Sequence, residues 1–217
     1  MKIGMILDAP YPIDPRVTNE AKALISSGNE VFLFCLSFNK SFKSNEIING
    51  INVVRFFCSK ITYKLSALAY TFPFYKWSMS KKIKKFIKTY NVDVLHVHDL
   101  QIASSVFYAK TKFNLKITLD LHENRPEIMK FYKHVNGFFG KMFIYPSLWK
   151  KAEERYCKKS SSVVVVTDLA KKELVERVNI NEKKVVVFSN SVSKSFYTDP
   201  FFDDVIIKKY SDSFIHS

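Results

Sequence analysis

A short stretch with the sequence HVHDL combines two histidines with an acid. His96 and His98 are two residues apart, so on a strand both imidazoles would point to the same side. Asp99 follows at a position where its carboxylate could accept hydrogen bonds from the first N–H groups of a helix. An imidazole can move a proton, bind a metal ion or bind a hydroxyl, which makes this stretch a candidate site.

A second stretch, LDLHENRPE, places His122 directly after another apolar run, with Glu123 and Glu127 close behind it. The imidazole could lie against a sugar hydroxyl or a leaving-group phosphate, with the carboxylates fixing its tautomer. A polar loop that ends at Pro126 explains the same residues equally well. We keep both interpretations.

The third stretch, DAPYPIDPR, follows the first apolar run and contains one acid and one arginine among its prolines. Pro15 suits the first position of a helix, whose N-terminus favours an anion. The guanidinium of Arg16 could bind a phosphate through two hydrogen bonds, with Asp14 beside it.

The histidines and acids could also bind a metal ion together, since imidazole and carboxylate suit zinc. The residues concerned are His96, His98, Asp99, His122 and Glu123. A buried strand histidine bonded to the backbone is commoner than a metal ligand, so we assign no metal site and expect no cofactor. A metal-dependent hydrolase stays open only if an ion binds these histidines.

The elements that must position these residues are short apolar runs, nearly all without apolar–polar alternation, and such runs indicate strands buried on both faces. We expect strands at Ile3–Leu7, Val31–Leu36, Val53–Phe57, Val92–Val97, Leu115–Leu121, Ser162–Val166 and Val185–Phe188. Helical patterns lie between them, at Val17–Ser27, Ser78–Tyr90, Leu100–Lys110, Phe138–Lys158 and Asp168–Val178.

Alternation of strands and helices predicts an α/β fold, a Rossmann-like parallel sheet with helices on both faces. Ligands of such sheets bind beyond the carboxyl ends of the strands. All three candidate stretches fall there, which is why we read them as one site.

The composition describes a basic chain that can bury one good core. It has 217 residues, 47% of them hydrophobic, and 34 basic against 20 acidic side chains. Such a surface attracts phosphates, anionic lipid or nucleic acid. The sequence has no zinc-finger spacing, basic heptad region or RNA-binding signature, so we expect no nucleic-acid partner. Three cysteines without paired spacing indicate buried reduced thiols and a cytoplasmic location.

The lysine-rich helix at Ser78–Tyr90 carries its apolar residues on one side and Lys81, Lys84, Lys85 and Lys88 on the other. A core-facing helix with a solvated face has this pattern. The alternative is peripheral attachment to an anionic membrane surface, which the aromatic run before the helix would help. The longest apolar stretch, Leu65–Met79, contains Pro73 and Lys76 and is too short to span a bilayer.

Five motifs in order resemble the N-terminal, acceptor-side half of a family 4 glycosyltransferase of the two-domain GT-B architecture. They are PIDPRVTNEAKALISSGNEV, VDVLHVHDL, KITLDLHENRPE, ERYCKKSSSVVVVT and VVVFSNSV, and they extend from Met1 to about Tyr197.

The resemblance implies retaining transfer of a sugar from a nucleotide sugar to a sugar or lipid-linked acceptor, for surface polysaccharide or glycolipid. His122 would then contact the transferred sugar, with Glu123 and Glu127 orienting it, and Asp14 and Arg16 would contact phosphate. His98 and Asp99 would line the acceptor side.

Members of this family continue into a donor-binding domain with two glutamates eight positions apart, and no glutamates here have that separation. We expect a domain at 1–190, followed at 191–217 by a linker and the start of a C-terminal domain that is otherwise missing. The lone chain would then be inactive or would need a separate donor half. The alternative is a non-catalytic module that binds an acceptor or a membrane.

Overall fold

In a computed structural model, which describes residues 1–131, 135 and 137–189, the chain forms one eight-stranded sheet. The strand order is β3-β4-β2-β1-β5-β6-β7-β8, and all neighbours are parallel except β3 with β4. The bounds are β1 Lys2–Ile6, β2 Glu30–Ser37, β3 Asn45–Ile48, β4 Ile51–Phe57, β5 Val94–His98, β6 Lys116–Leu121, β7 Ser162–Val165 and β8 Val185–Val187.

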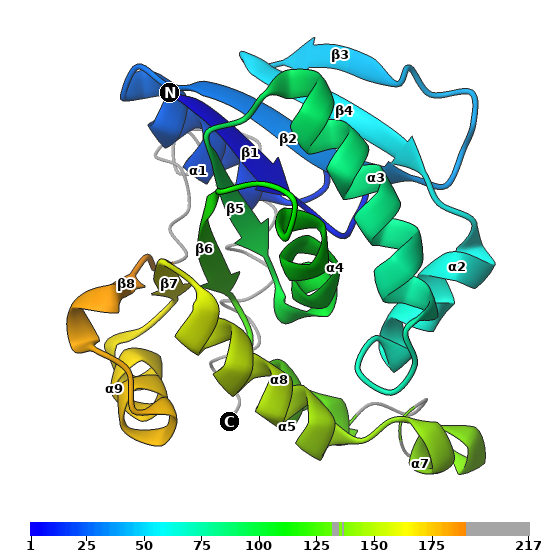
Figure 1. Ribbon diagram of the computed structural model, residues 1–217, viewed down its shortest axis with the longest axis vertical. Helices are drawn as coiled ribbons and strands as arrows, with labels where there is room; N and C mark the ends of the chain where they lie inside the picture. Colours follow the sequence, from blue (N-terminus) through cyan, green and yellow to red (C-terminus); the bar gives the residue numbers. More distant parts are fainter. Residues whose placement is uncertain (132–134, 136, 190–217) are drawn as a thin grey trace, which may run out of the picture.

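Helices cover both faces of the sheet (Figure 1). Helix α1 packs on one face with the core residues Val17 and Ala21, while α3, α4 and α8 form the layer on the other face. The α-helical bounds are α1 Pro15–Ser26, α2 Lys60–Lys64, α3 Phe74–Tyr90, α4 Leu100–Lys110, α5 Arg125–Ile128, α7 Phe138–Phe143, α8 Pro146–Lys159 and α9 Asp168–Val178. Short 3-10 turns lie at Leu65–Leu68, Met129–Phe131 and Glu182–Lys184. The predicted Rossmann-like α/β fold is confirmed.

Two of the differences from the sequence prediction have a clear local cause. The single helix expected over Phe138–Lys158 is two helices, because Pro146 disfavours a helical backbone at Tyr145, which adopts φ −110° and ψ 105°. Strand β3 was not predicted. It forms an antiparallel hairpin with β4 through Asn49 and Gly50, whose positive φ values of 52° and 81° suit a tight turn.

The direction of the strand order reverses between β1 and β5, and this point determines where the site lies. Because β1 leads through α1 to β2 on one side, while β5 leads through α4 to β6 on the other, the loops after β1 and β5 diverge. The gap between diverging loops is where α/β sheets bind ligands. The DAPYPIDPR loop, which follows β1, and the HVHDL stretch, which ends β5, both lie at this gap.

The three cysteines are buried with free thiols, as expected. No helix in the described ranges is both long and apolar enough to cross a membrane. The expected linker at 191–217 lies outside the described residues.

Candidate active site

The loop between β1 and α1 presents an acid and an arginine that bind each other. Asp14 is the N-cap of α1 and accepts a hydrogen bond from the backbone N–H of Arg16 at 3.0 Å, while Pro15 is the first helical residue. The Arg16 guanidinium donates through Nε to Asp14 Oδ1 at 3.2 Å and through Nη2 to Oδ2 at 2.7 Å. This paired geometry holds the guanidinium at the helix N-terminus, as the sequence indicates.

Charges from the other two candidate stretches shift the pKa values of Asp14 and Arg16. Burial lowers the pKa of Arg16, but the hydrogen bond and charge of Asp14 and the charges of Asp99 and Asp120 raise it above its ordinary value. For Asp14, burial raises the pKa, but the bonds and charge of Arg16 and the charge of His122 bring it below 3.8. The loop after β1 therefore lies close to the ends of β5 and β6.

Asp99 follows β5 in a strained backbone conformation, with φ 71° and ψ 150°. This region is essentially restricted to glycine and costs about 1–3 kcal/mol for other residues. Although Asp99 is the N-cap residue of α4, its side chain makes no capping hydrogen bond, so the expected capping role is wrong. Its backbone N–H donates instead to the Asp120 carbonyl at 3.0 Å. Strain of this kind is concentrated at functional sites, which favours a role for its carboxylate.

Three histidines stack beneath this surface. The rings of His96 and His98 have centroids 4.7 Å apart with an interplanar angle of 20°, and those of His98 and His122 have centroids 5.7 Å apart with an angle of 11°. His98 is fully buried and His122 is 8% exposed. The two-residue spacing therefore puts His96 and His98 on one side, as predicted.

Asp120, the next-to-last residue of strand β6, is the centre of the cluster. Its Oδ2 lies 2.8 Å from His122 Nε2, 3.1 Å from His98 Nδ1 and 3.5 Å from His96 Nε2. Burial raises the pKa of this carboxyl, but hydrogen bonds from His122, His96 and His98 lower it far below its usual range. Asp120 is therefore a buried anion held by imidazoles.

The pKa values of the two buried histidines that contact Asp120 are shifted in opposite directions. Burial lowers the pKa of His98 to about 4, despite its bond to Asp120. Burial also lowers the pKa of His122, but the bond and charge of Asp120 and the charge of Asp99 raise it above 6.5 overall. His122 therefore keeps a proton to higher pH than His98 does.

A cavity of about 310 Å³ opens beside His122, between the ends of β6 and β7 and helix α9. Its wall includes Glu123, which is exposed, and Thr167 and Arg177. Glu127 lies in α5 and is half-buried. The structure thus brings Arg16, His98, Asp99 and His122 close to Asp120, with Asp14 bound to Arg16 and Glu123 in the cavity wall.

Two acids of the cluster were not among the predicted site residues. Glu20 is 6% exposed and lies 3.3 Å from His96 Nε2, and Asp120 is fully buried. Both had a signal in the sequence. Glu20 falls at helical spacing with the buried Val17 and Ala21, so it shares their buried face. Asp120 precedes His122 by two residues and therefore points to the same side.

The family follows from a comparison with family models. The model described as Glycosyltransferase Family 4 matches residues 15–196. This chain belongs to glycosyltransferase family 4. The search of curated proteins gives no match.

Solved structures share the fold of this family 4 chain. Sucrose-phosphate synthase from Thermosynechococcus elongatus has a TM-score of 0.66 at 11% identity, over 90% of this chain and 49% of its own. A glycosyltransferase from Rickettsia africae has a TM-score of 0.52 at 19% identity, and the match covers 98% of this chain and 48% of that protein. A lipopolysaccharide outer core galactosyltransferase has a TM-score of 0.53 at 16% identity, and the match covers 89% of this chain and 46% of the galactosyltransferase.

The family 4 chain thus spans about half the length of each of these three solved structures. Its sheet is one Rossmann-like half of a GT-B fold. The surface at the carboxyl ends of β1, β5 and β6 carries the residues with strained backbone and shifted pKa values.

Proposed function

We propose that this chain is the acceptor-side half of a retaining glycosyltransferase that uses a nucleotide sugar. The observation that carries the proposal is the convergence of Arg16, Asp99 and His122 at the point where the strand order reverses. A cation, an anion and an imidazole of raised pKa at one surface suit a substrate with both phosphate and hydroxyl groups.

His122 would contact a hydroxyl of the transferred sugar. Because Asp120 accepts from Nε2, Nδ1 is the ring nitrogen left for the substrate. Positive charge develops on the sugar as its bond to the nucleotide diphosphate breaks, and a preorganised polar group stabilises that change. Glu123, exposed beside the cavity, and Glu127 would help to orient the sugar and the imidazole.

Arg16 and Asp14 would act on phosphate as a unit. Asp14 uses two of the guanidinium donors, so the remaining donors of Arg16 and the N-terminus of α1 face an anion. His98 would support the acceptor side from within, since it is fully buried and contacts Asp120. Asp99 would accept from an acceptor hydroxyl.

The acceptor would be a sugar or a lipid-linked sugar, used for surface polysaccharide or glycolipid on the cytoplasmic face of a membrane. An aromatic patch supports a lipid surface. Phe72, Phe74 and Trp77 are 37–57% exposed, and ring contacts of 5.9–6.3 Å link them to Phe143 in α7. Exposed aromatics beside a lysine-rich helix are typical of peripheral membrane attachment.

A donor-binding half, on the same or a separate chain, would complete the enzyme. The test is to co-express this chain with the reading frame downstream of the codon for Ser217 and to measure release of nucleoside diphosphate from UDP- and GDP-sugars. His122→Ala should lower turnover more than tenfold. The matched control is Lys112→Ala, an exposed residue in the loop before β6, at the opposite end of the strand.

Normal turnover in folded His122→Ala would remove His122 from the reaction. If the downstream frame encodes no domain of this kind, and the chain binds acceptor or vesicles but never turns over a sugar nucleotide, the non-catalytic binding module is correct instead.

A further inference from the structure

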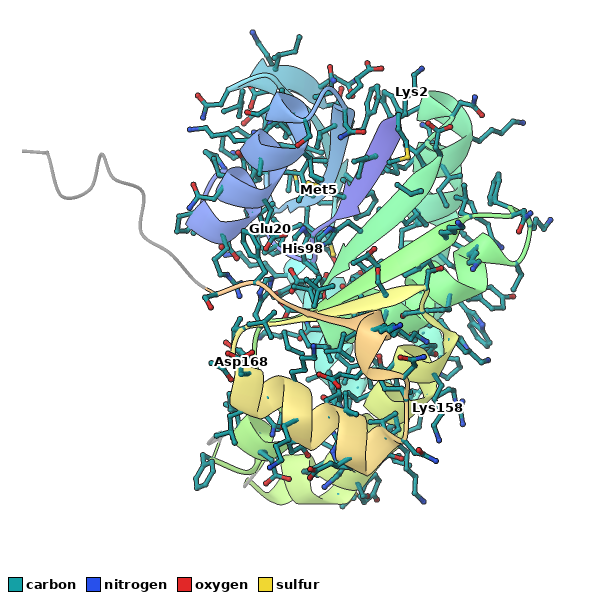
Figure 2. All side chains as sticks on the ribbon, turned by 90° about the vertical axis from the view of Figure 1, so that its left-hand side faces the viewer. Lys2, Met5, Glu20, His98, Lys158 and Asp168 are labelled. Atoms are coloured by element: carbon teal, nitrogen blue, oxygen red, sulfur yellow. The ribbon has the colours of Figure 1, made fainter. Side chains whose placement is uncertain are left out.

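Four buried side chains from three elements direct donor atoms to one point. Glu20 comes from α1, His98 from the end of β5, and Asp120 and His122 from the end of β6. Figure 2 shows Glu20 and His98 next to each other where the helix lies over the strands. One donor atom from each of the four side chains lies within 4.8 Å of the others, and none of the four residues is more than 8% exposed.

Two separations in the cluster are longer than ordinary direct hydrogen bonds. His98 Nδ1 is 3.4 Å from His122 Nε2 and 3.9 Å from Glu20 Oε2. Both distances exceed the usual hydrogen-bond range of about 2.7–3.2 Å. Zinc at about 2.0–2.1 Å from each ligand in a tetrahedron would have donors about 3.3–3.4 Å apart. The contacts of Asp120 Oδ2 with His122 and His98, at 2.8 and 3.1 Å, are shorter and would lengthen slightly around an ion.

The charges of the cluster also favour a cation. Glu20 and Asp120 bring two carboxylates into the core, and within the described part of the chain Glu20 Oε2 has no hydrogen-bond partner. A buried carboxylate must be paired, neutralised by a proton or bound to a metal ion. Two carboxylates, two neutral imidazoles and one divalent ion sum to zero charge.

We propose that Glu20, His98, Asp120 and His122 bind one zinc ion, which ties α1 to the ends of β5 and β6. His96 lies against the same ligands, with Nε2 3.3 Å from Glu20 Oε2 and 3.5 Å from Asp120 Oδ2. Two nitrogen and two oxygen donors in a compact set suit zinc.

The zinc would be structural. A catalytic zinc keeps one position open for water or substrate, whereas this site has four protein ligands that are nearly or fully buried. A zinc ion held in this way would not act as the catalytic metal of a hydrolase. Zinc bound to His122 Nε2 would replace the hydrogen bond from that atom to Asp120 and would hold the same imidazole, whose Nδ1 we assign to the sugar.

The first test is zinc content and thermal stability of the untagged full chain. After chelation and reloading, the chain should retain about one zinc ion. Saturating zinc should raise the melting temperature by roughly 5 °C or more over the chelated form. Less than about a tenth of an ion per chain, with no thermal shift, would overturn the proposal.

Cobalt identifies the ligands. Co²⁺ in the site should give the visible absorption of a tetrahedral complex without the intense near-ultraviolet band of thiolate ligands. Burial raises the pKa values of Cys35 and Cys157 to about 12, so both stay protonated in the folded chain. A thiolate band would show that the metal binds elsewhere.

Two variants separate the site from adventitious binding. Glu20→Gln should weaken zinc at least tenfold, because it removes one anionic ligand at almost unchanged volume. Glu176→Gln makes the same change at an exposed residue of α9, and this variant should bind zinc with the affinity of the unsubstituted chain. Equal affinity in both variants contradicts the proposal. These readouts are metal binding alone, so their failure leaves the proposed transferase function standing.

Discussion

Asp120 and His122 leave the end of β6 on the same side, and the carboxylate Oδ2 of Asp120 lies 2.8 Å from Nε2 of His122. This contact decides which ring nitrogen faces outward and raises the pKa of the imidazole despite its burial. It also joins a residue at the surface of the site to a residue that is fully buried. Asp120 is thus a positioning residue, because it acts on a substrate only through His122.

We expect Asp120→Asn to damage turnover rather than substrate binding. The amide removes the charge that fixes His122, directly or through the proposed zinc ion, so kcat of the reconstituted transferase should fall about tenfold to a hundredfold, as for other carboxylates that orient a functional histidine. The KM values should change little, because the side chain is buried away from substrate. Steady-state kinetics and the nitrogen chemical shifts of His122 check this. A rise in KM with unchanged kcat, or an unchanged tautomer, would contradict the assignment.

Asp14 should stabilise α1 in a way that depends on pH. Its folded pKa lies below the ordinary 3.8, so its contribution is complete above that value and is lost as pH falls through the folded pKa. Asp14→Ala should therefore lower the free energy of unfolding by about 1 kcal/mol at neutral pH and by progressively less in acid.

Thr167 provides the matched control for Asp14, because it caps α9 through its hydroxyl, which accepts from the Ala170 N–H at 3.1 Å. Thr167→Ala should also lower the free energy of unfolding by about 1 kcal/mol. This loss should be the same at acid and neutral pH, since a hydroxyl does not titrate there. Urea unfolding at several pH values compares the two. A pH-independent effect of Asp14→Ala would show that its carboxylate is not stabilised by Arg16.

Arg177 should be essential to the fold because it neutralises a buried acid. It binds Glu153, which is 3% exposed, and also Glu173 at 2.5 Å and Glu154 at 3.3 Å. Arg177→Met leaves Glu153 buried without its partner and should cost about 3 kcal/mol of unfolding free energy. Adding Glu153→Gln should recover part of that loss, and Glu173→Gln alone should cost at most about 0.5 kcal/mol.

The pH dependence of Arg177→Met has the opposite sign to that of Asp14. Burial already raises the pKa of Glu153 above 4.5 even though Arg177 lowers it, so removing the arginine raises it further. The folded state of the variant then binds a proton more tightly than the unfolded state. Its stability should fall as pH rises between the two pKa values. Stability that increases over this range would show that Glu153 gains another cation.

The sheet was predictable because its strands are buried on both faces and read as continuous apolar runs. Leu100–Lys110 and Asp168–Val178 have the same bounds in the sequence prediction and in the structure. The hairpin of β3 and β4 was missed although Asn49 and Gly50 form a strong turn signal, because the flanking segments were short. Local patterns thus identified most elements.

The site was predicted less completely, for a physical reason. His98 and His122 follow strands, and the carboxyl ends of parallel strands meet in any sheet of this class. Glu20 is different, because it reaches the histidines only through the packing of α1 on the sheet, which joins residues about 75 to 100 positions apart. A single sequence does not state which helix residue meets which strand end.

Membrane attachment should depend on one face of α3. Its buried face contains Tyr75, Met79 and Ile83, so the opposite stripe begins with Trp77 and continues through exposed lysines at helical spacing. These lysines are Lys81, Lys85 and Lys88. Each lysine near an anionic surface contributes about 1 kcal/mol. Replacing all three with glutamate should therefore weaken binding to anionic vesicles by about a hundredfold.

Flotation with vesicles of phosphatidylglycerol and phosphatidylcholine at low and high salt measures this attachment. The control replaces Lys112, Lys172 and Lys183 with glutamate, which changes net charge equally at exposed positions outside α3. In Figure 1, α9, which carries Lys172, lies at the far end of the sheet from α3. The control should lose only the general attraction of a basic chain, which salt also screens. Equal loss in both variants would mean that net charge alone causes binding and that the aromatic and lysine face of α3 has no special role.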